Sequence, residues 1–122
     1  MTEKTRILVA EDDDQQRESL VAHLSDEGYD VTEASSGNDA IPLIHGKEFN
    51  LVLLDLQMPY IDGFEVLKFI KGTFQKTKVI ILTAYGDLIN IEKCKKLGAD
   101  EVIGKPYNLE DLFAIIRDVI KR

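Results

Sequence analysis

The chain has 122 residues, the length of a single domain that buries its own core. Its 22 acidic residues outnumber its 15 basic ones, and the net charge of −7 argues against direct nucleic-acid binding and against adsorption to an anionic membrane. Cys94 is the single cysteine, the N-terminus is polar, and no apolar run approaches the ~20 residues of a membrane span. These features exclude disulfide scaffolds, zinc ribbons, membrane proteins and secreted proteins, and they predict a cytoplasmic location.

Five short apolar runs alternate along the chain with five longer segments of helical spacing. Three of the runs are continuously apolar, which is typical of strands buried on both faces of a parallel sheet. The predicted strands are residues 7–10, 29–34, 51–54, 79–82 and 102–103. The predicted helices are marked by Leu20 and Leu24, by Ile41 and Ile44, by Phe64 to Ile70, by Leu88 to Leu97 and by Leu109 to Ile120.

Capping and breaking residues refine the ends of these helices. Gly28 and Gly98 follow the first and fourth helical segments, where glycine is a good C-terminal residue. Asn108 is the expected N-cap of the fifth helix. Pro42 lies inside the second, which it should kink or shorten because it removes a backbone donor.

The repeated strand–helix pattern predicts an α/β fold in which right-handed crossovers place helices on both faces of a parallel sheet. Five units are too few for an eight-stranded barrel, so we expect an open, doubly wound sheet. Functional sites in such sheets form at the carboxyl ends of the strands.

Polar side chains follow four of the five predicted strands. Glu11 and Asp12 follow the first strand, Asp55 the third, Thr83 the fourth and Lys105 the fifth. Clustered carboxylates repel one another, and Mg²⁺ would relieve that repulsion while leaving positions open for phosphoryl oxygens. Asp55 is then a candidate nucleophile toward phosphorus, with Thr83 and Lys105 as partners for the phosphoryl oxygens.

At these residues the sequence resembles the receiver domain of two-component response regulators. The resemblance extends over nearly the whole chain, and its matching segments are residues 7–13, 53–59, 62–63, 82–84, 98–100 and 105–106. It implies a flavodoxin-like, receiver-type fold: a five-stranded parallel sheet in the order 2-1-3-4-5 with five flanking helices. We expect one receiver domain over residues 1–122, either standing alone or taken from a longer regulator.

The resemblance also implies the roles of the acidic residues. Asp55 would be the phosphoacceptor. Mg²⁺ would be held by Asp12, by Asp55, by the main-chain carbonyl of Gln57, and by Glu11 through a water molecule.

Further roles follow from the same resemblance. Thr83 and Lys105 would contact the phosphoryl group, and the peptide bond between Lys105 and Pro106 is often cis in this family. The family usually carries Tyr or Phe three residues before the lysine, where this chain has Val102. A rotating aromatic side chain therefore cannot report phosphorylation, and we expect backbone movement after Thr83 instead.

Two positions are expected to tune the lifetime of the phosphoryl group. The resemblance places Gln57 and Tyr85 where they control the approach of water to the phosphorylated Asp55. Tyr85 is bulky and Gln57 cannot act as a general base, so we expect slow self-hydrolysis.

The predicted function is that of a phosphoacceptor signalling domain. A histidine kinase or phosphotransfer protein would phosphorylate Asp55. The surface of the fourth helix, fifth strand and fifth helix would then bind an output domain or protein partner, and a phosphorylation-dependent homodimer is a further expectation. Such a domain is not an enzyme, since it assists only its own phosphorylation and dephosphorylation.

Two alternatives have different requirements. An aspartyl-nucleophile phosphatase or phosphotransferase commonly has a second acid two residues after the nucleophile, where this chain has Gln57. A flavodoxin-like cofactor module needs a phosphate-binding loop after the first strand, where the run from Glu11 to Asp14 would repel a phosphate.

Overall fold

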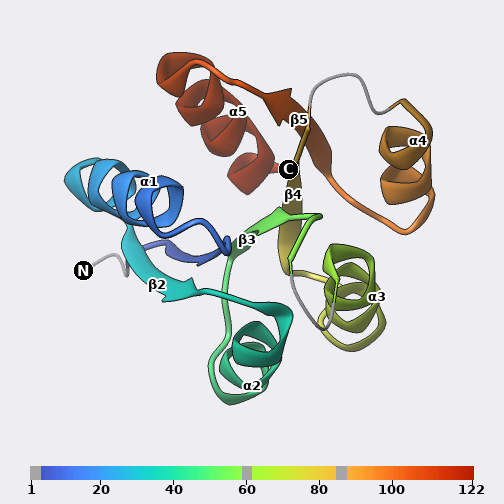
Figure 1. The fold of residues 1–122 in the computed structure, drawn as a ribbon. Helices are drawn as coiled ribbons and strands as arrows, with labels where there is room; N and C mark the ends of the chain where they lie inside the picture. Colours follow the sequence, from blue (N-terminus) through green and yellow to red (C-terminus); the bar gives the residue numbers. More distant parts are fainter. Residues whose placement is uncertain (1–3, 59–61, 85–87) are drawn as a thin grey trace.

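The computed structural model describes residues 4–58, 62–84 and 88–122. Within these ranges, strands and helices alternate along the chain as the sequence predicts (Figure 1). The elements are β1 (Arg6–Ala10), α1 (Asp14–Asp26), β2 (Asp30–Ala34), α2 (Gly37–Gly46), β3 (Leu51–Asp55), α3 (Gly63–Thr73), β4 (Lys78–Ala84), α4 (Leu88–Lys96), β5 (Glu101–Lys105) and α5 (Leu109–Lys121).

The strands form one parallel sheet in the order β2-β1-β3-β4-β5. The predicted fold class and strand order are therefore confirmed. Helices α1 and α5 cover one face of the sheet, and α2, α3 and α4 cover the other (Figure 1). This arrangement leaves the carboxyl edge of the central strands free of helices, so the residues that follow those strands can meet there.

Burial on both faces explains the continuous apolar runs. In β3 every residue from Leu51 to Asp55 is buried. Leu51 and Leu53 pack with α1 and α5, whereas Val52 and Leu54 pack on the opposite face. Neighbouring side chains of a strand point to opposite faces, so a strand with two covered faces needs an apolar residue at each position.

The helix ends follow the residue chemistry. Asn108 caps α5 by accepting hydrogen bonds from the main-chain nitrogens of Glu110 and Asp111. Gly28 and Gly98 adopt φ of +94° and +103° after α1 and α4, a conformation that favours glycine. These predicted ends are confirmed.

Helix α2 continues through Pro42 as far as Gly46, so the proline lies inside the helix as the sequence predicts. One expectation about element length was less accurate. Strand β5 runs from Glu101 to Lys105, longer than the apolar pair at 102–103. Its outer residues pair with β4 through the backbone, so this extension leaves no hydrophobic signal.

Across the described ranges, no helix combines the length and the apolar character needed to cross a membrane.

Candidate functional site

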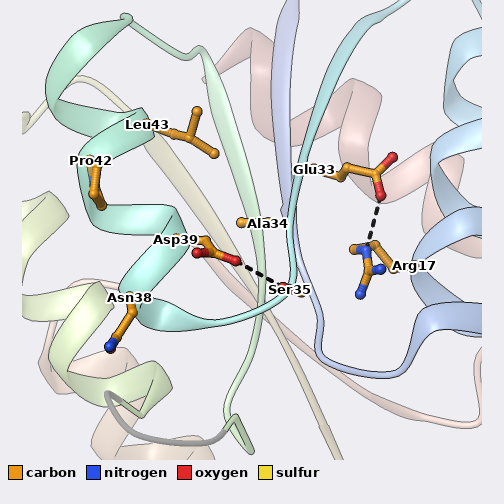
Figure 2. Close-up of a pocket in the computed structure, with 8 residues that line it drawn as sticks. All are labelled: Arg17, Glu33, Ala34, Ser35, Asn38, Asp39, Pro42 and Leu43. Carbon is orange, nitrogen blue, oxygen red and sulfur yellow. Dashed lines mark hydrogen bonds and ion pairs between the residues drawn. The ribbon is translucent and has the colours of Figure 1, made fainter.

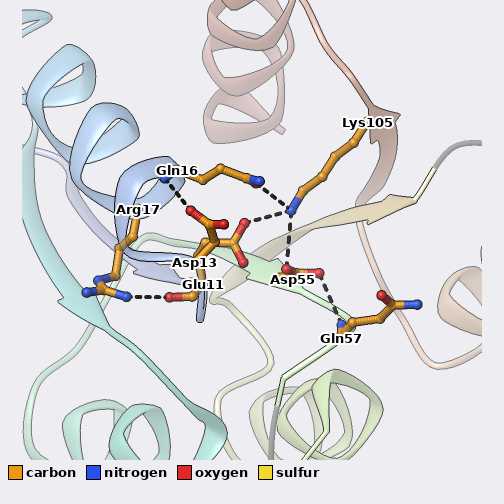
Figure 3. Close-up of polar contacts among 7 residues, drawn as sticks. All are labelled: Glu11, Asp13, Gln16, Arg17, Asp55, Gln57 and Lys105. Atoms are coloured by element: carbon orange, nitrogen blue, oxygen red, sulfur yellow. Dashed lines mark hydrogen bonds and ion pairs between the residues drawn. The ribbon is translucent and has the colours of Figure 1, made fainter.

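The carboxyl edge of the sheet brings together the acidic residues predicted from the sequence, of which Figure 3 shows Glu11 and Asp55. One carboxylate oxygen each from Glu11, Asp12 and Asp55 lies within 4.8 Å of the others. Strands β1 and β3 are neighbours in the sheet, so residues that follow them are adjacent in space although more than forty positions separate them in the chain. Glu11 and Asp55 are buried, while Asp12 is exposed.

Lys105 supplies the positive charge of the cluster. Its Nζ donates to Oε1 of Glu11 at 2.6 Å and to Oδ2 of Asp55 at 3.2 Å. A third hydrogen bond, of 3.0 Å, goes to Oε1 of Gln16 in the first turn of α1. An ammonium group has three N–H donors, so these contacts use all of them.

Burial and the surplus of acid govern the electrostatics of the cluster. Burial first, and then the neighbouring Asp55, raise the pKa of Glu11 to about 8, against the opposing effect of Lys105. Burial lowers the pKa of Lys105, but the hydrogen bond to Glu11 and the charge of Asp55 outweigh it, so the net direction is upward. The two shifts have different origins: burial and the nearby Asp55 act on Glu11, whereas the two carboxylates that contact Lys105 act on the lysine.

The second oxygen of Glu11 provides a test of whether a cation fits. The side chain is only 4% exposed, and its Oε2 atom has no hydrogen-bond partner among the described residues. A buried polar oxygen without a partner is costly, whether or not the carboxyl group is charged. Carboxylate oxygens are the ligands that Mg²⁺ prefers, so the donor set of this cluster fits a hard divalent cation.

The loop after Asp55 is held close to α3. Oδ1 of Asp55 accepts a hydrogen bond of 3.1 Å from the main-chain nitrogen of Gln57, whose side chain is exposed. The main-chain nitrogen of Gly63 donates to the Leu56 carbonyl, and a Cβ at Gly63 would lie 2.6 Å from the Leu56 Cα. Only glycine allows this approach, which fixes the path of the chain next to the candidate phosphoacceptor.

The remaining predicted residues lie as follows. Thr83 is buried in β4, opposite Gly104 of β5. Val102 is partly buried and packs on the face covered by α2, α3 and α4. The peptide bond between Lys105 and Pro106 is cis. Tyr85 lies outside the described residues.

Two residues near the cluster were not predicted from the sequence. Gln16 contacts Lys105, and Arg17 donates through Nη1 to the main-chain carbonyl of Glu11 at 2.9 Å (Figure 3). Asp13 caps α1 by accepting from the Gln16 nitrogen, and the first turn of the helix lies beside the carboxyl edge, where Gln16 reaches Lys105. The capping position indicates that residues 16 and 17 lie beside the loop, because the helix begins at Asp14, but it does not identify their partners.

Comparison with known proteins gives a consistent result. The family model of the response regulator receiver domain matches residues 7–117. The sporulation initiation phosphotransferase F of Bacillus subtilis (strain 168) is 37% identical over 117 residues, which cover 96% of this chain and 91% of that protein. The response regulator MprA of Mycolicibacterium vanbaalenii is 38% identical over 117 residues.

Solved structures and chain lengths add to this comparison. The receiver domain protein (CheY-like) of Methanospirillum hungatei JF-1 superposes with a TM-score of 0.94 at 32% identity, covering 98% of this chain and 95% of that one. The match to MprA covers 96% of this chain but 51% of that protein. The chain thus spans about half the length of MprA and of several other curated relatives.

Proposed function

The chain belongs to the receiver domain family of two-component response regulators, and from this premise we propose that Asp55 accepts a phosphoryl group. Members of this family are signalling domains that work with kinases and output domains, and the alternative of an independent phosphatase is not favoured. The observation that carries the proposal is the environment of Asp55. This buried carboxylate is paired with Lys105 and lies beside two further acids at the edge of the sheet.

The proposed reaction is an exchange of one bond to phosphorus for another. A carboxylate oxygen of Asp55 forms the new P–O bond while the P–N bond of a phosphohistidine donor breaks and the electron pair leaves with the imidazole. Lys105 offsets the negative charge on the transferring group by redirecting the N–H groups that it donates to Glu11 and Asp55 in the unphosphorylated chain. Buried Thr83 supplies a hydroxyl donor from the neighbouring strand.

We assign the cation site to Asp12, Asp55, the main-chain carbonyl of Gln57, and Glu11 acting through water. When bound there, Mg²⁺ would offset the charge of the phosphoryl oxygens that the carboxylates would otherwise repel. The partnerless Oε2 of Glu11 and the spacing of the three carboxylates support this assignment.

The proposed partners follow from the family and from the length of the relatives. A histidine kinase or phosphotransfer protein donates the phosphoryl group, as the name of the Bacillus phosphotransferase suggests. Output passes through the surface formed by α4, β5 and α5 to a further domain or protein, or to a second phosphorylated copy. We expect one domain over residues 1–122, acting in the cytoplasm and assisting only its own phosphorylation and dephosphorylation.

Readout and lifetime are part of the same proposal. Val102 cannot act as a rotating aromatic switch, so movement of the backbone after Thr83 carries the signal. Gln57 and Tyr85 restrict the access of water and make self-hydrolysis slow. The exposed side chain of Gln57 beside the acceptor supports its part in this role.

The decisive experiment is phosphorylation by a small acyl phosphate with Mg²⁺, followed by intact-mass spectrometry. The wild type should gain one phosphoryl group and Asp55→Asn should gain none, because an amide is not a nucleophile toward phosphorus. Asp13→Asn is the matched control: it removes one nearby acid, and asparagine also caps a helix well.

Undiminished labelling of Asp55→Asn would refute the assignment of the acceptor. Repeated turnover of unrelated phosphoesters by the wild type would instead support the enzyme alternative.

A further inference from the structure

Arg17 is a nearly buried cation beside the acidic pair. Its side chain is 10% exposed, and its guanidinium group makes three hydrogen bonds to three different segments. Nη1 donates to the Glu11 carbonyl at 2.9 Å (Figure 3), and Nε donates to Oε1 of Glu33 in β2 at 3.1 Å (Figure 2). Nη2 donates to Oδ1 of Asp14 at 2.6 Å. The planar fork of arginine makes such directional contacts possible.

Hydrogen bonds hold the residues on both sides of Asp12. Before it, the Glu11 carbonyl binds the guanidinium group, while the Glu11 nitrogen donates to the Ala34 carbonyl at 3.0 Å. After it, the Asp13 carbonyl accepts from the main-chain nitrogen of Arg17 at 2.9 Å. Asp12 itself is exposed, so neighbouring packing does not hold its side chain. The position of its peptide therefore depends on the bonds to its two neighbours, and the Arg17 side chain supplies the one to the Glu11 carbonyl.

A purely structural role would leave one of these contacts unexplained. Two carboxylates, Asp14 and Glu33, already compensate the charge of Arg17. The hydrogen bond to the Glu11 carbonyl adds no charge compensation, but it immobilises the peptide that joins Glu11 to Asp12. This is the segment from which two of the three carboxylates of the cluster extend.

We propose that Arg17 is a positioning residue for the cation site, which sets the spacing of the Glu11 and Asp12 carboxylates before a cation arrives. The inference rests on the proposed function, because it concerns the same site. Residues that orient metal ligands typically change metal affinity 10- to 100-fold when they are removed. Arg17 itself contacts no bound group, and its effect passes through the Glu11 main chain.

An effect of charge and an effect of positioning predict opposite changes in Mg²⁺ affinity when Arg17 is replaced. By charge alone, removing a cation near the cluster strengthens the binding of Mg²⁺. If Arg17 acts by positioning, removing its guanidinium group frees the Glu11 carbonyl and weakens the binding of Mg²⁺, because the ligands must then be ordered when the cation binds. The direction of the change in affinity therefore distinguishes the two.

The variants should fold, because the side of Arg17 away from the cluster is open. Arg17 and Glu33 line a cavity of about 470 Å³ between β2 and α2 (Figure 2). The Glu33 side chain is 49% exposed and that of Asp14 76%, so water can solvate both carboxylates when the guanidinium group is absent.

The test is the binding of Mg²⁺ alone, measured by isothermal titration calorimetry on wild type, Arg17→Met, Arg17→Lys and Glu33→Gln. Arg17→Met removes the charge and the fork, whereas Arg17→Lys keeps the charge and removes the fork. We expect both to weaken binding about tenfold. Glu33→Gln keeps the bond to the Glu11 carbonyl and should bind within about twofold of the wild type.

A second readout needs no metal. In the metal-free chain, Arg17→Met should speed amide hydrogen exchange at Glu11 and Gln16 and leave the amides of β3 unchanged. Unchanged or tighter Mg²⁺ binding by Arg17→Met would overturn the inference. If Arg17→Met does not fold, Arg17→Lys replaces it in the test. Weaker Mg²⁺ binding by Arg17→Lys would then support the inference, and unchanged binding would overturn it.

Failure of the proposed metal site would look different, because the wild type itself would then bind no Mg²⁺.

Discussion

Two lysines lie in polar clusters at opposite edges of the same sheet. The two clusters differ in their balance of positive and negative charge, and this difference distinguishes a structural cluster from a functional one. At the amino edge, Lys71 of α3 donates to Oδ2 of Asp100 at 2.9 Å and to the Thr77 carbonyl at 3.0 Å. The same Asp100 oxygen accepts the main-chain nitrogen of Val79 at 2.8 Å. The charges of one acid and one cation balance, and main-chain groups make the remaining hydrogen bonds. This cluster therefore joins α3, β4 and the loop before β5.

At the carboxyl edge, one lysine faces a surplus of acid. Lys105 bonds to two carboxylates, the Asp12 carboxylate lies within reach of both, and one oxygen of Glu11 is without a partner in the described part of the chain. A lysine–carboxylate contact therefore does not by itself indicate a functional site. The surplus negative charge does, because it leaves the cluster incomplete until a cation or a phosphoryl group changes its composition.

The pH dependence of the free energy of unfolding should separate the two clusters most strongly. The pKa of Glu11 rises from an ordinary 4.5 to about 8 in the folded chain, so folding favours its protonated form. Its contribution to stability is complete below pH 4.5 and is lost as the pH rises through about 8. Without metal, we expect a loss of roughly 3 kcal/mol between about pH 5 and pH 8.

Urea denaturation at several pH values, on wild type and Glu11→Gln, measures this effect. Glutamine cannot titrate, so the difference between the two profiles isolates the carboxyl group of Glu11. Parallel profiles across that range would contradict the expectation.

Mg²⁺ should stabilise the fold through the carboxyl edge alone, since only the folded chain assembles the carboxylates there. With free Mg²⁺ at about 100 times its dissociation constant, the wild type should gain about 2.7 kcal/mol of stability. Asp12→Asn should lose most of this gain, whereas Asp100→Asn at the other edge should keep it. Thermal unfolding with and without Mg²⁺ measures both, and equal shifts in wild type and Asp12→Asn would place the metal elsewhere.

The smallest expected effect is on the stability of the metal-free chain. The same Asp→Asn change should have opposite signs in the two clusters. Asp100→Asn weakens two hydrogen bonds to a charged acceptor and should destabilise the metal-free chain by about 2 kcal/mol. Asp55→Asn removes one charge from a repulsive cluster and should stabilise the metal-free chain by about 1 kcal/mol at about pH 8. The measurement is the urea midpoint at constant m-value, and two changes of the same sign would show that the clusters do not differ in charge balance.

Hydrophobic periodicity and the alternation of strands with helices were enough to predict the fold class and to identify the polar residues that follow the strands. Continuous apolar runs identify buried parallel strands, and the doubly wound topology brings the carboxyl ends of those strands to one edge. Glu11, Asp55 and Lys105 could therefore be grouped in advance, although Lys105 and Glu11 lie 94 positions apart.

The other side chains that complete the site became evident only from the packing of the helices on the sheet. Gln16 and Arg17 are ordinary polar residues of an amphipathic helix in the sequence, and nothing in their spacing identifies Lys105 or the Glu11 carbonyl as a partner. The approach of Gly63 to Leu56 is equally invisible, because glycine at a helix start has several uses. These contacts depend on how α1 and α3 lie on the sheet to within about an ångström, the precision of a hydrogen bond. Hydrophobic periodicity specifies which face of a helix is buried, and it contains no information at that precision.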